Sequence, residues 1–279
     1  MSEPITDRPV SQTPPGVSVL VCSCDRYADL WRPFFEIFHL RWPNCPWPLY
    51  VGSNHRLFEG PGVTTLAIGE DRAWGQNLLA MLDRIETPRV LLMLEDFLIR
   101  KPVDNEQVTA LATVAAYEDL ACLRLTPMPR PSRRLAGYPR LGEIRPGDEY
   151  RVSTQAAIWR VSALRQLLRP PFSAWQFEQL GSVLSERLMP RGFWGTYDPA
   201  IDYLHGVDRG LWLPRGLEIC RQAGVQVDLW ARSEISPRQL AARNRKTFVY
   251  AIFRHALPRP LQRWLRRRQA ASASRGLEP

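Results

Sequence analysis

Two adjacent carboxylates, Glu95 and Asp96, stand directly after an unbroken apolar run at residues 90–94. A run of this length is typical of a strand that is buried on both faces, as in the centre of a parallel sheet. Ligands of open α/β sheets bind beyond the carboxyl ends of the strands. Two acids at that place could hold a divalent cation and, through it, a phosphate group. The alternative is a strand that ends in a solvated acidic turn without a ligand.

The segments around this acidic pair alternate between short apolar runs and amphipathic stretches. Strands are expected at residues 17–22, 49–51, 63–68, 90–94, 121–125 and 152–159, and helices at residues 29–40, 74–85, 106–117 and 162–169. Ser173 and Gln176 form a capping-box pattern, which predicts that another helix begins there. This alternation is typical of an α/β fold with right-handed crossovers. Residues 126–150, rich in Pro, Arg and Gly, predict a long loop over the site.

The composition predicts a folded protein without a secretory or membrane segment. The chain has 279 residues, of which 45% are hydrophobic, and this is enough for one large domain or two modest ones. Residues 1–16 are expected to form a flexible lead-in rather than a signal peptide. No apolar run reaches the length of a membrane span. The five cysteines show no zinc spacing and no disulfide framework, which favours reduced thiols in a cytoplasmic protein.

The net charge of +9 is concentrated at the C-terminal end. From Pro237 onward eleven Arg and Lys residues face one acid, so that segment carries +10 and residues 1–236 carry −1. A neutral body argues against nucleic acid as a partner. We expect a main domain at residues 17–236 and a basic helical appendage at residues 237–279. Mixed basic and apolar residues in the appendage favour an interfacial helix on anionic lipid, and packing against the main domain is the alternative.

Several short segments, taken in chain order, resemble one family. They are the strand and polar turn at residues 17–27, the helix that begins at Trp74, the strand end Glu95-Asp96-Phe97, and residues 155–159, 175–178 and 203–212. Over about residues 17–230 this order resembles the bacterial family-2-like glycosyltransferases with a GT-A fold, of the cell-surface polysaccharide type. The resemblance implies a Rossmann-like α/β domain with a mixed, mostly parallel sheet flanked by helices. It also implies a nucleoside-diphosphate sugar donor, a saccharide or lipid-linked acceptor, and a cytoplasmic enzyme at the inner face of the membrane.

In that family the acidic strand end binds Mg²⁺ or Mn²⁺ on the diphosphate of the donor. The resemblance therefore makes Glu95, Asp96 and His205 candidate metal ligands. Phe97 departs from the family pattern, because it occupies the position of the second aspartate. The alternative that the enzyme works without a metal ion therefore stays open. A lone histidine is also compatible with a structural role, and Arg209 and Arg215 are alternative partners for the diphosphate.

The resemblance assigns the nucleotide and donor sugar to residues near the first strands. The residues that it implies are Ser23, Asp25, Arg26, Tyr27, Ser53, Asn77 and Asp96. In this interpretation Asp25 accepts hydrogen bonds from the ribose or base, and Tyr27 stacks on the base. The competing interpretation is a plain strand-to-helix turn in which Asp25 caps the helix. Asn77 is likewise compatible with an ordinary helix position.

Glu178 is the expected general base, because an inverting sugar transfer needs a carboxylate that takes the proton of the acceptor hydroxyl. Trp175 is expected to bind the acceptor by stacking on a sugar face. The alternative is that Glu178, in an early helical turn, only complements the helix dipole. Two other functions stay open. One is a nucleotidyltransferase, although the Gly-rich loop of that class is missing after the first strand; the other is a non-catalytic nucleotide- or glycan-binding protein.

Overall fold

The computed structural model describes residues 16–243 and residue 245. The expected main domain therefore falls within the described residues. Except for Gly16, the expected lead-in lies outside them, as does most of the basic appendage, so the proposed lipid-binding helix stays a prediction. Residues 237–243, where the appendage was expected to begin, are helical.

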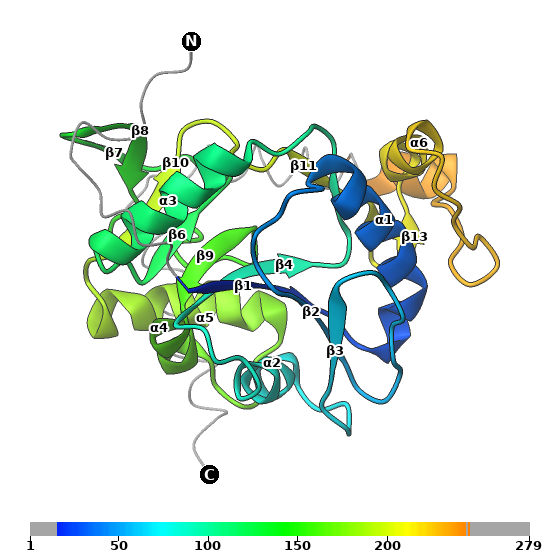
Figure 1. Ribbon diagram of the computed structural model, residues 1–279, viewed down its shortest axis with the longest axis horizontal. Helices are drawn as coiled ribbons and strands as arrows, with labels where there is room; N and C mark the ends of the chain where they lie inside the picture. Colours follow the sequence, from blue (N-terminus) through cyan, green and yellow to red (C-terminus); the bar gives the residue numbers. More distant parts are fainter. Residues whose placement is uncertain (1–15, 244, 246–279) are drawn as a thin grey trace.

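A nine-stranded sheet runs through the described part of the chain (Figure 1). In spatial order its strands are β3 (Val63–Ala67), β2 (Leu49–Ser53), β1 (Val17–Cys22), β4 (Arg89–Leu94), β9 (Ala157–Arg160), β6 (Cys122–Arg124), β10 (Phe193–Thr196), β8 (Tyr138–Glu143) and β7 (Arg133–Leu135). β3, β2, β1 and β4 pair in parallel, whereas β9 and β8 are each antiparallel to both neighbours. The remaining seven strands thus share one direction, and the predicted mixed, mostly parallel α/β sheet is confirmed.

Two short ribbons lie beside this sheet. β5 (Phe97–Ile99) pairs with β11 (Tyr203–His205), and β12 (Val207–Asp208) pairs with β13 (Leu211–Trp212). The pairing of β5 with β11 brings residues near position 205 back to the end of β4. The ribbon of β5 and β11 therefore joins distant parts of the sequence, whereas β12 and β13 form a local hairpin.

Helices cover both faces of the main sheet. One face carries η1 (Asp25–Leu30), α1 (Trp31–Arg41), α3 (Asn105–Tyr117) and α6 (Pro214–Gln222), and the other carries α2 (Trp74–Leu82), α4 (Val161–Leu167) and α5 (Ala174–Leu188). Along β4, Leu91 and Met93 belong to the first buried cluster, and Val90 and Leu92 to the second. Alternate residues of a strand point to opposite faces. An apolar run without polar interruption is therefore buried on both faces, as the sequence predicts.

Two expectations about the elements are wrong. Residues 126–150 are not one long loop, because they contain the hairpin of β7 and β8, which joins the sheet through β10. Pairing with a distant strand stabilises this Pro- and Gly-rich segment, and local periodicity does not report such a partner. The strand expected at residues 152–159 begins only at Ala157. Ser153 and Thr154 instead turn toward α5 and hydrogen-bond to Glu178.

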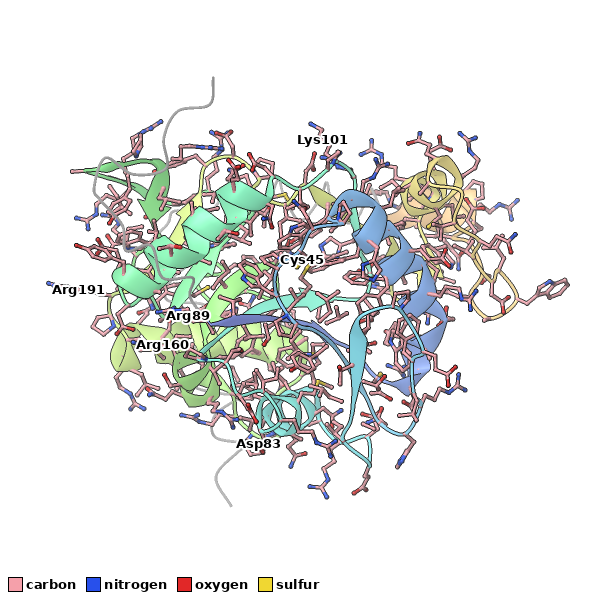
Figure 2. The ribbon with its side chains drawn as sticks, in the orientation of Figure 1. Cys45, Asp83, Arg89, Lys101, Arg160 and Arg191 are labelled. Atoms are coloured by element: carbon pink, nitrogen blue, oxygen red, sulfur yellow. The ribbon has the colours of Figure 1, made fainter. Side chains whose placement is uncertain are left out.

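The amino end of β4 is closed by charged side chains. Arg89 and Arg160 are register partners on β4 and β9 and lie close together (Figure 2). Both pair with Asp119. Arg89 also donates from Nη1 to the carbonyl of Leu120 at 2.8 Å. These contacts occupy the amino end of the central strands and leave the opposite end for a ligand.

The five cysteines are free thiols, as expected. Burial raises the pKa of Cys22, Cys122 and Cys220, which makes them poor nucleophiles and ordinary packing residues. Across residues 16–243, none of the helices combines the length and the apolar character that crossing a membrane demands.

Candidate active site

The carboxyl ends of β1 and β4 border a hollow of about 680 Å³, which we call the strand-end hollow. Cys22 and Leu94, the last residues of these strands, are register partners. The polar residues that follow them, Ser23 on one side and Glu95 with Asp96 on the other, therefore meet at one edge and line the hollow. Its remaining polar lining includes Cys24, Arg26, Tyr27, Asp71, Arg72, Asn77, His205, Asp208, Arg209 and Arg243.

Glu95 is nearly closed off from solvent, with 8% of its surface exposed. Burial is the main cause that raises the pKa of Glu95 to about 8, and the charge of Asp96 is the second. Ser23 accepts a hydrogen bond from Trp31 Nε1 at 2.8 Å, and its own hydroxyl is therefore available to bond to Glu95. Both causes favour the protonated form of Glu95, and a nearby positive charge would favour its ionised form.

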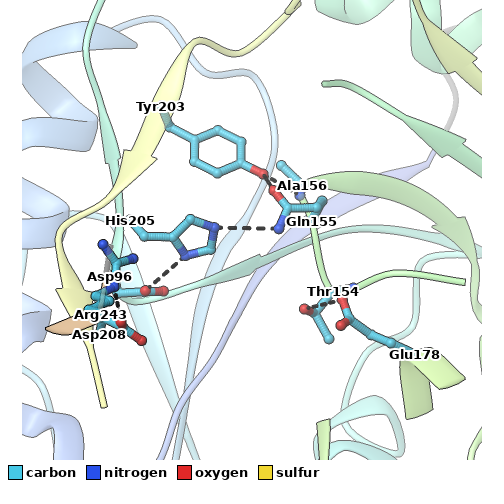
Figure 3. A network of polar contacts seen from close by, with 9 residues as sticks. All are labelled: Asp96, Thr154, Gln155, Ala156, Glu178, Tyr203, His205, Asp208 and Arg243. Carbon is cyan, nitrogen blue, oxygen red and sulfur yellow. Dashed lines mark hydrogen bonds and ion pairs between the residues drawn. The ribbon is translucent and has the colours of Figure 1, made fainter. Parts of the chain in front are cut away.

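Asp96 pairs with His205, whose place is set by the ribbon of β5 and β11 (Figure 3). His205 is the register partner of Phe97, and its Nδ1 lies 3.0 Å from Asp96 Oδ2. Burial lowers the pKa of His205, but the hydrogen bond and charge of Asp96 outweigh it and raise the pKa above its ordinary value. Phe97 is fully buried and stacks on Tyr203 with a ring separation of 4.4 Å. Phe97, where a second acid was expected, is therefore part of the core and helps to position His205.

A chain of polar contacts leads from His205 to β9. Gln155 Nε2 lies 3.4 Å from His205 Nε2, and the Tyr203 hydroxyl donates to Gln155 Oε1 at 2.6 Å (Figure 3). The Tyr203 hydroxyl also accepts from the Ala156 backbone N–H at 3.1 Å. The sequence placed Gln155 in a family-like segment but gave it no role, because its partners lie about fifty residues later in the chain.

Glu178 lies in a neighbouring hollow of about 330 Å³, which we call the Glu178 hollow. The capping box at Ser173 is confirmed, and it fixes the start of α5 about one turn before Glu178. Glu178 Oε1 accepts from the Ser153 hydroxyl at 3.1 Å and from the backbone N–H and hydroxyl of Thr154 at 2.8 and 2.9 Å. Gln155 lines the same hollow and connects it to His205. Trp175 is 66% exposed and does not line either hollow.

Asp25 holds the chain that follows β2. Its Oδ1 accepts from the Ser53 hydroxyl at 2.8 Å and from the Asn54 N–H at 2.9 Å, and the N–H groups of His55 and Arg56 also donate to the carboxylate. Burial raises the pKa of Asp25, but these bonds outweigh it and lower the pKa below the ordinary value. The helix-cap interpretation of Asp25 is wrong, since Cys24 occupies the N-cap of η1. Asp25 and Ser53 do not line the strand-end hollow, so a nucleotide role for them stays a prediction.

Asn77 shapes the loop before α2. Its Nδ2 donates to Asp71 Oδ1 at 2.7 Å, and its Oδ1 accepts from the Arg72 N–H at 3.0 Å. Asn77 itself is buried at the wall of the strand-end hollow. Sequence analysis missed Asp71 and Arg72, although Asp71 follows the expected third strand and could have been chosen by the same rule that selected Asp96.

The ring of Tyr27 lies against two guanidinium groups. The Cζ atoms of Arg26 and Arg232 lie 5.5 and 4.8 Å from the ring centroid. Arg232 is buried and donates from Nε and Nη2 to Asp29 at 2.8 Å. Arg232 thereby fixes η1 and the aromatic wall of the hollow, which the sequence pattern did not indicate.

Arg209 is held at the rim in an uncommon backbone conformation. It forms with Gly210 the two-residue turn between β12 and β13, and both residues have positive φ angles, of 50° and 79°. Such turns favour Asn-Gly, and an arginine there carries local backbone strain. Its side chain is exposed at the strand-end hollow. A strained cation at the rim of a cavity suggests a ligand-binding role.

The described residues contain no group of three His, Cys, Asp or Glu side chains that could hold a metal ion. Mg²⁺ and Mn²⁺ nevertheless need only one or two carboxylates where phosphate and water supply the other oxygens. Glu95 and Asp96 fit a cation of that kind, because a cation would offset the burial that disfavours ionised Glu95. His205 differs, since its Nδ1 is already paired with Asp96. The residues thus fit a cation that arrives with a phosphate ligand, rather than a preformed metal site.

No protein-family model matches the chain, and no curated protein matches it either. Among solved structures, the mannosyltransferase PcManGT of Pyrobaculum calidifontis, in complex with GDP-Man and Mn²⁺, is similar at 13% identity and a TM-score of 0.46, over 75% of this chain and 62% of that one. TarS of S. aureus is similar at 13% identity and a TM-score of 0.42, over 64% of this chain and 60% of that one. The bifunctional IspDF of Campylobacter jejuni is similar at 12% identity and a TM-score of 0.38, over 68% of this chain and 52% of that one. The chain thus spans less than two thirds of each, and likenesses this low establish neither a family nor an activity.

Proposed function

We propose that the protein is a glycosyltransferase that moves a sugar from a nucleoside-diphosphate donor to a hydroxyl acceptor with inversion. The observation that carries the proposal is the lining of the strand-end hollow. Two adjacent carboxylates and the arginines Arg26, Arg72 and Arg209 surround a cavity at the carboxyl ends of parallel strands. This is the usual ligand position in an open α/β sheet. Guanidinium groups bind phosphate oxygens strongly, and carboxylates bind them only through a cation.

In this proposal the strand-end hollow holds the donor. Tyr27 supplies an aromatic surface for the base, and Ser23 and Asn77 line the same wall. Glu95 and Asp96 would hold a divalent cation, which when bound neutralises the charge that grows on the leaving diphosphate. Arg209 lines the same hollow and would bind the same group. Asp25 supports donor binding indirectly, because its carboxylate fixes the turn after β2.

Glu178 is the proposed general base. Its Oε1 is held by three hydrogen bonds, while none of the described residues donates to its Oε2. Oε2 is thus the atom that takes the hydroxyl proton. The acceptor oxygen then bonds to the anomeric carbon, the bond from that carbon to the diphosphate breaks, and the nucleoside diphosphate leaves with the electron pair. Direct attack of this kind inverts the anomeric centre.

The test is a measurement of nucleoside diphosphate released from a panel of sugar nucleotides, with and without Mn²⁺. We expect release from one donor class, and we expect Glu178→Gln to abolish transfer while it leaves donor affinity largely intact. Glu86→Gln, a change of an exposed glutamate away from both hollows, is the matched control. Undiminished turnover in Glu178→Gln would refute the base assignment. Release of pyrophosphate from nucleoside triphosphates would indicate a nucleotidyltransferase instead, and binding without turnover a binding protein.

A further inference from the structure

One continuous chain of hydrogen bonds joins the start of β9 to the end of β4, and its direction follows from the group at one end (Figure 3). The backbone N–H of Ala156 donates to the Tyr203 hydroxyl oxygen at 3.1 Å. A backbone N–H can only donate, so this oxygen is an acceptor here. The proton of the Tyr203 hydroxyl is directed to Gln155 Oε1, which lies 2.6 Å away.

The Gln155 amide passes this direction on to His205. An amide accepts only at its oxygen and donates only at its nitrogen, so its orientation follows from its partners. Because Gln155 Oε1 faces Tyr203, its Nε2 faces His205 Nε2, at a distance of 3.4 Å. The ring nitrogen Nε2 is therefore the acceptor.

The last bond of the chain ends on Asp96. A neutral imidazole has one donor and one acceptor nitrogen, so His205 with an accepting Nε2 carries its proton on Nδ1. This Nδ1 lies 3.0 Å from Asp96 Oδ2 and donates to it. A single backbone N–H thus sets the direction of four successive hydrogen bonds, and the direction is the one that a carboxylate acceptor requires.

The backbone at the Asp96 end of the chain is fixed, and aromatic contacts hold two of the side chains. Phe97 contacts the rings of Tyr203 and His205, with ring centroids 4.4 and 4.8 Å apart. The Gly206 N–H donates to the backbone carbonyl of Asp96 at 2.7 Å. The hydrogen bonds of the chain limit the rotation that is left to the imidazole and carboxylate groups.

The consequence for Asp96 is that its two carboxylate oxygens differ. Oδ2 accepts from His205, whereas none of the described residues donates to Oδ1. Both ring nitrogens of His205 are engaged, so His205 offers no lone pair to a cation. Asp96 and His205 line the strand-end hollow, but Gln155 and Tyr203 do not. Gln155 and Tyr203 therefore act on this hollow only through His205.

We propose that Gln155 and Tyr203 are positioning residues for Asp96. They hold His205 with its proton on Nδ1, and His205 holds the carboxylate so that Oδ1 is left for a ligand. Partners that hydrogen-bond to a ligand-binding group fix its orientation in this way. What Asp96 binds rests on the proposed function, whereas the direction of the chain rests on the geometry alone.

The direction is tested by ¹⁵N NMR of the intact protein with ¹⁵N-labelled histidine, at about pH 9, well above the ordinary pKa of histidine. The signals of His205 are those that disappear in His205→Asn. We expect the ring proton on Nδ1 and a hydrogen bond accepted at Nε2. In Gln155→Leu the Nε2 signal should move toward that of a nitrogen without a donor. Tyr203→Phe should move it in the same direction, because the amide loses the partner that orients it.

The effect on Asp96 is measured by calorimetry with UDP, GDP and dTDP in the presence of Mn²⁺. We expect Gln155→Leu and Tyr203→Phe each to weaken binding about fivefold. The double variant should bind no more weakly than the weaker single variant, because both residues act through one chain. Gln166→Leu and Tyr117→Phe, exposed positions outside both hollows, are the matched controls in both experiments and should change nothing.

A ring proton on Nε2 of His205 in the intact protein would overturn the inference. So would an Nε2 signal that is the same in Gln155→Leu and Gln166→Leu, or losses of affinity that add in the double variant. If a nucleoside diphosphate binds and neither variant weakens it, this inference fails and the proposed function stands. If the NMR signals are as expected but no nucleoside diphosphate binds, the proposed function fails and the hydrogen-bond direction stands.

Discussion

Asp25 shows how an acidic residue near a strand end can hold a neighbouring turn in place. Its carboxylate accepts from Ser53 and from three successive backbone N–H groups after β2. Hydrogen bonds to a charged group each contribute about 1.5–3 kcal/mol. The sequence could not reveal this role, since the donors lie about thirty residues later and are mostly backbone groups.

We expect Asp25→Asn to lower the free energy of unfolding by about 2 kcal/mol at neutral pH. The folded-state pKa of Asp25 is below its ordinary value of 3.8. The carboxylate therefore stabilises the fold fully above pH 3.8, and this contribution is lost as the pH falls through the folded pKa. The difference between the two proteins should shrink accordingly in urea titrations at pH 7 and pH 3. Asp83→Asn, at an exposed ion pair with Arg165, is the control, and equal stability of both variants at pH 7 would contradict the account.

Arg209 is expected to lower the stability of the fold while it strengthens the binding of a nucleoside diphosphate. Arg209→Asn places the preferred Asn-Gly pair in the turn and should raise the free energy of unfolding by about 0.5–1 kcal/mol. The same change removes a cation from the rim of the strand-end hollow and should weaken nucleoside-diphosphate binding several-fold. Thermal unfolding and calorimetry on the same preparation measure both effects. A more stable variant with unchanged affinity would show that the strain has no part in binding.

The elements of the fold could be predicted where the sequence carries its own signal. The apolar run before Glu95 and the capping box at Ser173 each gave an element that the structure confirms. β10 and α6 were not predicted, because β10 is only four residues long and contains Gly195, and α6 buries only Gly216, Ile219 and Cys220. The same limit applies to the site. The acids after β4 follow from strand order, but the contacts of Gln155 depend on His205 and Tyr203, about fifty residues later, and no local pattern reports them.

Gly75 sets how closely α2 approaches the chain before α5. A Cβ at this position would lie 2.5 Å from the carbonyl oxygen of Arg169, and the Gly75 N–H donates to the Phe172 carbonyl at 2.8 Å. Alanine normally favours a helix by about 1 kcal/mol over glycine. Here the clash with rigid backbone outweighs this gain in helix stability. We therefore expect Gly75→Ala to lower the free energy of unfolding by about 2 kcal/mol.

Gly181→Ala is the matched comparison for this change. Gly181 lies within α5, and an added Cβ would meet the side chain of Val152 at 3.1 Å, which can adjust more easily than backbone. We expect a clearly smaller loss in denaturant titration. If Gly75→Ala proved as stable as the intact protein, the close approach of α2 to residues 169–172 would not hold.

Across the whole molecule, a neutral body and a basic end suggest separate tasks. The hollows belong to residues 16–243, whereas most of the excess positive charge lies beyond them. We propose that the end attaches the enzyme to the inner face of a membrane, close to a lipid-linked acceptor. Replacing Arg266, Arg267 and Arg268 with glutamine should release the protein from vesicles rich in anionic lipid in a flotation assay. Flotation equal to that of the intact chain would exclude electrostatic attachment through these residues.

The capture of a nucleoside diphosphate between the ends of β1 and β4 is tested most directly by calorimetry. UDP, GDP and dTDP would be titrated into the intact protein and into Asp96→Asn, with and without Mn²⁺. Asp198→Asn, an exposed position outside the strand-end hollow, is the control. We predict that one nucleoside diphosphate binds the intact protein and the control alike, and binds Asp96→Asn about tenfold more weakly. If no nucleoside diphosphate binds under either condition, or if Asp96→Asn binds as well as the control, the account is contradicted.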